Sequence, residues 1–125
     1  LKEKSFVLWG LSFKPNTDDT RESMALELIK FLSPRVKKLY LFDPKVRKGS
    51  VKQFDQYNNI QFMRSQYEKF HLSDGLIICT EWDNFKFPEI KELDKLKDKV
   101  IFDGRNILDG KEIRKNNLTY IGIGQ

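Results

Sequence analysis

Short, almost continuous runs of hydrophobic residues recur along the chain, and each ends in residues that favour turns. Four runs, at residues 5–10, 38–44, 75–80 and 99–104, are rich in Val, Ile, Leu, Phe or Tyr and are too short to form helices. Residues 118–124 make a weaker fifth run. Runs of this length are typical of strands that are buried on both faces, as in parallel sheets. The pattern therefore predicts a parallel sheet built from these runs.

Segments with helical periodicity lie between the hydrophobic runs. In the clearest, residues 22–32, hydrophobic residues recur on one face, and Asp19 or Thr20 can cap its start. Strands that alternate with helices form βαβ units. We therefore expect one three-layer α/β domain with an open, doubly wound, mostly parallel sheet of the Rossmann-like kind. Weaker helical patterns lie at residues 65–72, 88–97 and 109–116.

Composition agrees with a single globular domain. The chain has 125 residues, of which 39% are hydrophobic and 33% are charged. No hydrophobic run approaches the roughly 18 residues that a membrane span needs, so we expect no membrane contact. The single cysteine, Cys79, rules out an internal disulfide and fits a reducing cytoplasm, where we expect the protein. Because the chain starts at Leu1 rather than Met, we expect a piece of a longer protein.

The chain carries a formal net charge of +5, which raises the question of a nucleic-acid partner. The lysines are scattered, however, and alternate with acids, as in residues 91–99. Mixed-sign runs of this kind are typical of a solvated helix face. We therefore expect no nucleic-acid binding, while the diffuse positive charge also suits a small anionic ligand.

Polar and charged residues follow four of the predicted strands. They lie in residues 10–21, at Asp43, in residues 80–82 and in residues 103–106. Ligands of open α/β sheets bind at the carboxyl ends of the strands, so these segments define the predicted site. The first turn has one glycine, Gly10, and lacks the glycine fingerprint that holds NAD pyrophosphate. The usual Rossmann mode of NAD binding is therefore not expected here.

Three basic residues are candidates for binding an anion, and each has a structural alternative. Lys14 can meet a phosphate as a point charge, or it is an ordinary surface lysine. The guanidinium of Arg105 can clamp a phosphate or carboxylate, or it pairs with Asp103 or Glu81. Arg21 lies at a predicted helix start, where its charge opposes the helix dipole. It therefore pairs with a nearby acid or reaches an anionic partner.

Other candidates are equally open to two interpretations. Asp43 can bind a ribose or can cap the turn that it begins. Phe13 can line a pocket or pack in the core, and Trp82 can stack on a flat ligand or pack in the core. Cys79 lies inside a hydrophobic run and is expected to behave as a small hydrophobic residue. The sequence shows no catalytic triad, metal-ligand cluster or acid–base pair, so no catalytic residue and no metal is predicted.

Three motifs together resemble a known family. They are GLSFKPNTDDTRES at residues 10–23, DGLIICTEWDNF at residues 74–85 and IFDGRN at residues 101–106. In this order they resemble the C-terminal domain of the UDP-glucose/GDP-mannose dehydrogenase family, over residues 4–124. The first two are most similar to the members that oxidise UDP-glucose. Members that act on UDP-N-acetylmannosamine or GDP-mannose are the alternatives.

The resemblance implies that residues 1–125 are a C-terminal nucleotide-sugar (UDP)-binding domain. An NAD-binding N-terminal domain and a helical middle domain would then lie elsewhere in a parent that is a homodimer or a larger homo-oligomer. The parent would oxidise the C6 alcohol of UDP-glucose to a carboxylate through a thioester on a cysteine outside this chain. The chain alone is therefore expected to be inactive.

The same resemblance implies roles for particular residues. Phe13, Lys14 and Arg105 would contact the UDP-sugar, and Arg21 would reach NAD, which is held mainly by the N-terminal domain. A stand-alone nucleotide-sugar binding module is the alternative to a domain of a larger dehydrogenase.

Overall fold

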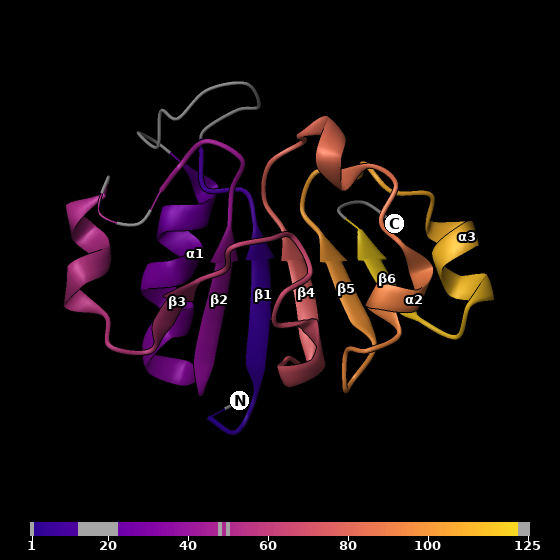
Figure 1. Cartoon of the computed structure of the whole chain (residues 1–125). Coiled ribbons are helices and arrows are strands. Elements are labelled where there is room, and N and C mark those ends of the chain that lie inside the picture. The colour runs from indigo at the N-terminus through magenta and orange to yellow at the C-terminus, as the bar shows by residue number, and fades with distance from the viewer. Residues whose placement is uncertain (1, 13–22, 48, 50, 123–125) are drawn as a thin grey trace.

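The structure is a computed structural model that describes residues 2–12, 23–47, 49 and 51–122. In these residues six strands form one parallel sheet in the order β3-β2-β1-β4-β5-β6 (Figure 1). This is an open, doubly wound, Rossmann-like sheet, so the predicted fold class is confirmed. The strands are β1 Ser5–Trp9, β2 Lys38–Phe42, β3 Ile60–Phe62, β4 Gly75–Ile78, β5 Val100–Asp103 and β6 Thr119–Gly122.

In the described residues, three α-helices flank the sheet. They are α1 Met24–Leu32, α2 Ile90–Leu93 and α3 Gly110–Lys115. Short 3₁₀ helices connect other elements, at Ser33–Arg35, Lys52–Gln56, Phe70–Leu72 and Asp83–Phe85. None of the described helices is long and hydrophobic enough to cross a membrane.

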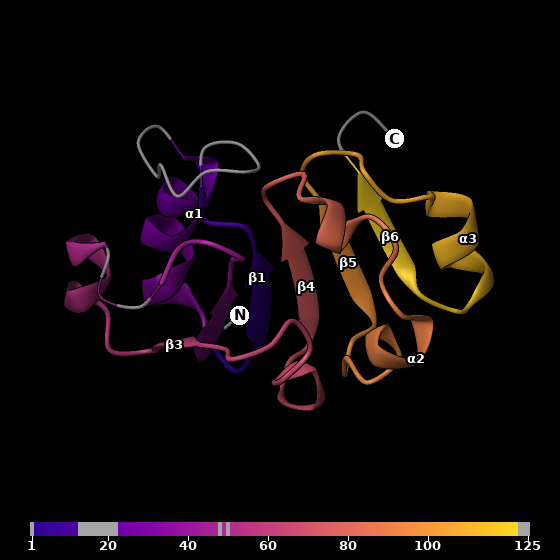
Figure 2. The same cartoon turned by 45° about the horizontal axis from the view of Figure 1, so that its top comes forward.

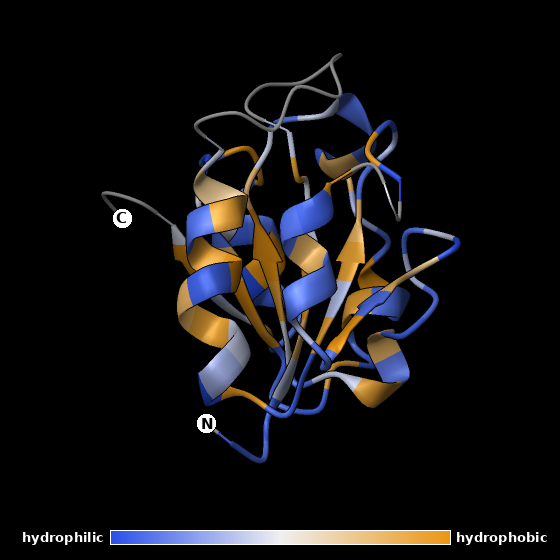
Figure 3. Ribbon diagram, turned by 90° about the vertical axis from the view of Figure 1, so that its left-hand side faces the viewer, coloured by the Kyte–Doolittle hydropathy of each residue, from blue (hydrophilic) through white to orange (hydrophobic). Residues whose placement is uncertain are grey.

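Each layer packs against its own face of the sheet. One face, here called the α1 face, carries a hydrophobic cluster that contains Leu8, Leu41 and Ile29 of α1. The opposite face, here called the α2–α3 face, carries a second cluster that contains Leu93 of α2 and Ile113 of α3. Hydrophobic residues follow the strands through the middle of the molecule (Figure 3). Both faces of β1 are buried, which explains its unbroken hydrophobic sequence.

Side-chain caps fix the starts of α1 and α3. The Ser23 hydroxyl accepts a hydrogen bond from the Ala25 N–H at 3.1 Å, so Ser23 caps α1 in place of the predicted Asp19 or Thr20. The Asp109 carboxylate accepts from the N–H groups of Lys111 and Glu112 and caps α3.

Three details differ from the sequence prediction. Residues 65–72 form turns that end in a 3₁₀ helix rather than an α-helix, and α2 covers only part of residues 88–97. The strand β3 was not predicted, because its three residues do not form a hydrophobic run. The strand predicted at residues 118–124 is present as β6.

Candidate functional site

The carboxyl ends of the strands meet at one edge of the sheet, which Figure 2 turns towards the viewer. Gly10 makes the first turn at this edge with φ +95°, and its N–H donates to the Phe42 carbonyl at 2.8 Å. A Cβ at this position would lie 2.5 Å from the Cβ and Oγ1 of Thr80. Glycine is therefore required here both by backbone conformation and by the close approach of the β4 end.

The same close approach ties the beginning of the first motif to the second. The Thr80 hydroxyl donates to the Ser12 carbonyl at 3.0 Å. The Ser23 hydroxyl donates to the Leu11 carbonyl at 2.8 Å. The residues on either side of positions 13–22 are thus bound to this edge of the sheet. Phe13, Lys14 and Arg21 lie outside the described residues, so their predicted roles stay predictions.

Asp43 follows β2 and is buried with its carboxylate surrounded by backbone N–H groups. One oxygen accepts from Leu11 at 2.7 Å and Ser12 at 3.2 Å. The other accepts from Lys45 at 2.8 Å and Val46 at 2.9 Å. These bonds occupy both oxygens, so Asp43 joins the turn after β1 to the turn after β2. The turn role is therefore supported over the ribose role.

Asp103, at the end of β5, is a second buried carboxylate with a similar structural role. It accepts from the Arg105 N–H at 3.1 Å, from the Leu108 N–H at 2.9 Å and from the Tyr120 hydroxyl at 2.8 Å. Burial raises the pKa of Tyr120, and the hydrogen bond to Asp103 raises it further. Asp103 thereby fixes the DGRN turn to β6.

Arg105 and Glu81 make an ion pair between the ends of β5 and β4. The distance from Arg105 Nη2 to Glu81 Oε1 is 3.1 Å. The side chains are 37% and 44% exposed, respectively. The sequence offered Asp103 or Glu81 as the ion-pair partner of Arg105. The guanidinium pairs with Glu81, whereas Asp103 accepts only the Arg105 backbone N–H. Because the pair is open to water, an incoming anion can replace Glu81 without a large desolvation cost.

The third motif passes close to the start of α1, which directly follows the first motif. A Cβ at Gly104 would lie 2.9 Å from the Ile78 carbonyl oxygen and 3.0 Å from the Met24 Cε. The DGRN turn therefore passes closely over the end of β4 and against the first residue of α1. In this way the described residues of the three motifs meet at one edge.

Trp82 and Cys79 both prove to be core residues. Trp82 is buried in the α2–α3 cluster, which supports packing over stacking on a ligand. Cys79 is buried, and burial raises the pKa of its thiol to about 12 although the Arg105 charge lowers it. A thiol of this kind stays protonated at neutral pH and is a poor nucleophile. The part of the chain that the structure describes contains no cluster of His, Cys, Asp or Glu that could hold a metal.

A feature that sequence reasoning missed is a cavity of about 680 Å³ at the ends of β2 and β3. Arg47 and Arg64 both line it, together with Phe42 and Met63. The Arg47 guanidinium donates to the carbonyls of Asp43 and Pro44. Arg47 and Arg64 are visible in the sequence as basic residues. Because β3 was not predicted, however, nothing in the sequence placed Arg64 next to Arg47.

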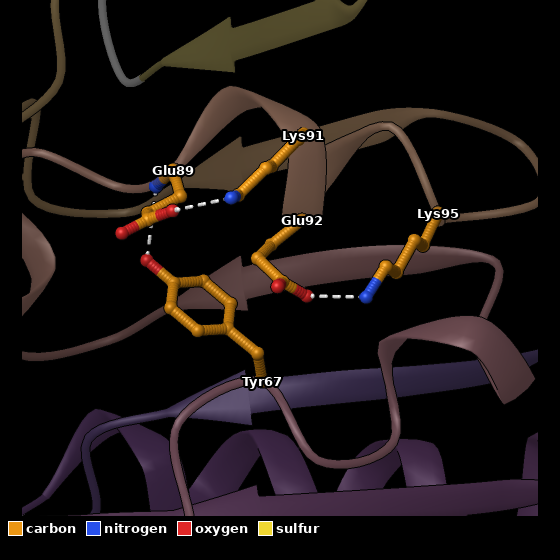
Figure 4. A network of polar contacts seen from close by, with 5 residues as sticks. All are labelled: Tyr67, Glu89, Lys91, Glu92 and Lys95. Carbon is orange, nitrogen blue, oxygen red and sulfur yellow. Dashed lines mark hydrogen bonds and ion pairs between the residues drawn. The ribbon is translucent and has the colours of Figure 1, made fainter.

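A polar network on α2 lies apart from this edge (Figure 4). The Tyr67 hydroxyl accepts from the Glu89 N–H at 3.0 Å. Lys91 and Glu89 make one ion pair, and Lys95 and Glu92 make another. Burial raises the pKa of Tyr67, while the hydrogen bond from the Glu89 N–H lowers it. These charged side chains are exposed to solvent to different degrees, as their alternating signs predicted, but only Lys91 and Glu92 lie on α2.

Comparison with known proteins adds to this geometry. Residues 7–110 match the family model described as the UDP-glucose/GDP-mannose dehydrogenase family, UDP binding domain. The chain belongs to this family. The resemblance drawn from the three motifs is therefore confirmed, and the described residues of these motifs meet at the carboxyl edge.

Individual relatives are longer than this chain. A UDP-glucose 6-dehydrogenase of Rattus norvegicus is 35% identical over 97% of the chain and 26% of its own length. An uncharacterized protein of Methanocaldococcus jannaschii is 39% identical over all of the chain and 15% of its own length. The chain thus spans about a quarter or less of these relatives.

The fold is shared with solved members of the family. The UDP-D-ManNAc dehydrogenase of Pyrococcus horikoshii superimposes with a TM-score of 0.79 at 27% identity. The alignment covers 98% of this chain and 26% of that structure. The chain therefore corresponds to about a quarter of that structure.

Proposed function

We propose that the chain is the UDP-sugar-binding, C-terminal domain of an NAD-dependent UDP-glucose 6-dehydrogenase that converts UDP-glucose to UDP-glucuronate. The observation that carries the proposal is the half-exposed Arg105 at the edge where the described residues of the three motifs meet. The buried Asp43 and Asp103 hold the turns around it. An exposed arginine on a fixed turn is suited to a charge-assisted contact with a diphosphate.

In this proposal the binding residues are Phe13, Lys14 and Arg105. Glu81 holds the Arg105 guanidinium until the ligand's diphosphate replaces it. Arg21 contacts NAD, which the N-terminal domain of the parent holds. NAD, when bound, accepts the hydride in each oxidation, and this chain contributes substrate binding and exclusion of water.

The proposal assigns the oxidation itself to other parts of the parent. Cys79 is buried, its pKa is raised to about 12, and it does not serve as the nucleophile. The 125-residue chain is therefore expected to produce no NADH with UDP-glucose and NAD. NADH formation by the purified chain would contradict this assignment.

Titration calorimetry with UDP on the full-length gene product tests the binding residues. Lys14→Ala and Arg105→Ala should each weaken binding by about ten- to a hundredfold, because each removes one charge-assisted contact. Lys115 is an exposed cation on α3, and Lys115→Ala is the matched control, which should bind UDP as tightly as the unsubstituted product does. Equal affinity in all four proteins would show that the site lies elsewhere.

Steady-state kinetics of the same product test the reaction and the role of Arg21. UDP-glucose should be oxidised in preference to UDP-N-acetylmannosamine, the type of substrate named for the Pyrococcus horikoshii relative. Arg21→Ala should raise KM for NAD more than KM for the sugar nucleotide. Preference for UDP-N-acetylmannosamine would move the chain to that branch of the family. A product with no oxidation but intact UDP binding would support the stand-alone binding module.

A further inference from the structure

The α1 face is uncovered over one half of the sheet. Ile77 of β4, Phe102 of β5 and Ile121 of β6 are neighbours in register across three strands. Phe102 is 36% and Ile121 46% exposed, and Ile77 is half-buried. We call these three residues the bare face. All-parallel sheets are normally covered on both faces, so exposed hydrophobic residues in register indicate a missing layer.

A hydrophobic groove continues the bare face to α1. A cavity of about 300 Å³ lies between Phe6, Ile77 and Phe102 of the sheet and Leu28 and Leu32 of α1. Leu28 and Leu32 are half-buried and form its side wall. The groove therefore has a floor formed by the sheet and a side wall formed by α1. A second helix that packed on this face beside α1 would occupy a groove of this shape.

The topology explains why the sheet's own connections leave this half open. Connections from β1 to β2 and from β2 to β3 lie on the α1 face, where Ile29 and Phe54 share a cluster. The later connections, towards β4, β5 and β6, lie on the opposite face, where Phe70, Leu93 and Ile113 pack. In Figure 1, α1 lies on the β2–β3 side of the sheet. Because crossovers between parallel strands are right-handed, a connection towards β6 cannot cover the α1 face.

We propose that a helix from another part of the same polypeptide, outside β1–β6, packs on the bare face beside α1. Helices pack about 8–10 Å apart while strands lie about 4.8 Å apart, so one helix covers about two strands. The β4–β6 half therefore has the width for one more helix. In the rat relative, this chain matches only 26% of the length, so most of that polypeptide lies outside the matched region and is long enough to contain such a helix.

The docking helix is hydrophobic on the side that faces the sheet. It presents residues spaced i, i+3, i+4 and i+7 to Ile77, Phe102 and Ile121, and its side packs against Leu28 and Leu32. The inference rests on the proposal that the chain is part of a longer dehydrogenase, but not on the UDP-binding residues. It would hold whichever sugar nucleotide the protein binds.

Cysteine labelling of the full-length gene product tests the covering layer. Phe102→Cys and Ile121→Cys are made separately, and maleimide labelling of each native protein is compared with labelling in urea. Lys115→Cys, on the exposed side of α3, gives the ratio of native to urea labelling rates for an uncovered site. For Phe102→Cys and Ile121→Cys this ratio should be at least about tenfold smaller than for Lys115→Cys. Cys79 is buried in the native protein, and the unchanged full-length product, labelled in parallel with and without urea, measures the background from all of its own cysteines. Ile121→Cys alters an edge strand and keeps the test valid if Phe102→Cys destabilises the sheet.

Photo-crosslinking identifies the occupant. Benzoylphenylalanine in place of Phe102 should yield, at nanomolar protein concentration, one intramolecular cross-link to a helical peptide outside residues 1–125. Rapid labelling at both cysteines overturns the proposal. A cross-link to a second copy, or protection that is lost on dilution, also overturns it and assigns the face to an oligomer contact. UDP titration of the same variants should be unchanged, so failure of the docking proposal is distinguishable from failure of the UDP site.

Discussion

Two acids at the carboxyl edge, Asp43 and Glu81, are used in opposite ways. On the β1–β2 side, Asp43 is buried and both its oxygens accept backbone N–H groups. On the β4–β5 side, Glu81 is half-exposed and pairs with the side chain of Arg105. An acid that follows a strand can thus hold two turns together through backbone N–H groups or form an ion pair that is open to solvent. Burial and the type of donor distinguish the two cases.

The largest effect is expected from removing the buried carboxylate. Asp43→Ala would leave four backbone N–H groups without their acceptor, at Leu11, Ser12, Lys45 and Val46. We expect the free energy of unfolding to fall by about 4 kcal/mol or more, measured by urea denaturation. Asp109→Ala, which removes an exposed helix cap, should cost only about 1 kcal/mol. Equal losses would mean that burial does not separate the two kinds of acid.

A smaller but still large effect is expected at the turn that Asp43 supports. Gly10→Ala combines a positive φ with a Cβ 2.5 Å from Thr80, so it should cost about 3 kcal/mol. Gly49→Ala is the matched control, because Gly49 has φ +90° but nothing within 4 Å of the added Cβ. It should cost about 1 kcal/mol, the part due to backbone conformation. Thermal melts of both variants measure the difference, and equal costs would show that Thr80 moves aside.

The β5 side has its own buried support, which is pH-dependent. Tyr120→Phe removes the hydroxyl that donates to Asp103 and should lower the free energy of unfolding by about 1 kcal/mol at pH 7. The raised pKa of Tyr120 means that the fold favours the protonated phenol. Its contribution is therefore complete below the unfolded-state pKa of about 10 and falls as pH rises above that value. Denaturation at pH 8 and 11 should show a shallower alkaline loss in Tyr120→Phe than in the unchanged protein; parallel losses would refute this.

Much of the fold follows from the sequence because strands buried on both faces leave unbroken hydrophobic runs. The exceptions have physical causes. β3 has only three residues, all half-buried, and so gives no such run. The predicted helix at residues 65–72 yields to tertiary packing, because Tyr67 and Phe70 both contact the ring of Trp9. The exposure of the bare face could not be predicted for a related reason. Phe102 lies in a hydrophobic run, and such a run predicts a strand that is buried on both faces.

The position of the candidate site was also predictable, but the roles of its residues were only partly so. Strand ends in a parallel sheet meet at one edge, which placed Arg105, Asp43 and Glu81 together. The sequence could not distinguish a ligand-binding Asp43 from a turn-forming one, because both occur after a strand. That difference depends on the N–H groups that reach the Asp43 carboxylate. Val46 is close to Asp43 in sequence, but Leu11 is far away in sequence and is brought near only by the fold.

The smallest effect on stability, and the sharpest test of the comparison, is expected from Glu81→Gln. The ion pair with Arg105 is half-exposed, so its loss should change the free energy of unfolding by no more than about 0.5 kcal/mol. If Glu81 competes with a diphosphate for the guanidinium, the neutral glutamine should bind UDP about two- to tenfold more tightly, since less electrostatic energy must be given up. Calorimetry with UDP, at two salt concentrations, measures this in the full-length product beside Asp83→Asn, an acid that pairs with Lys86 instead. Weaker binding in Glu81→Gln would show that Glu81 positions Arg105 for the ligand, and the exposed pair would then be as much a support as the buried carboxylate of Asp43.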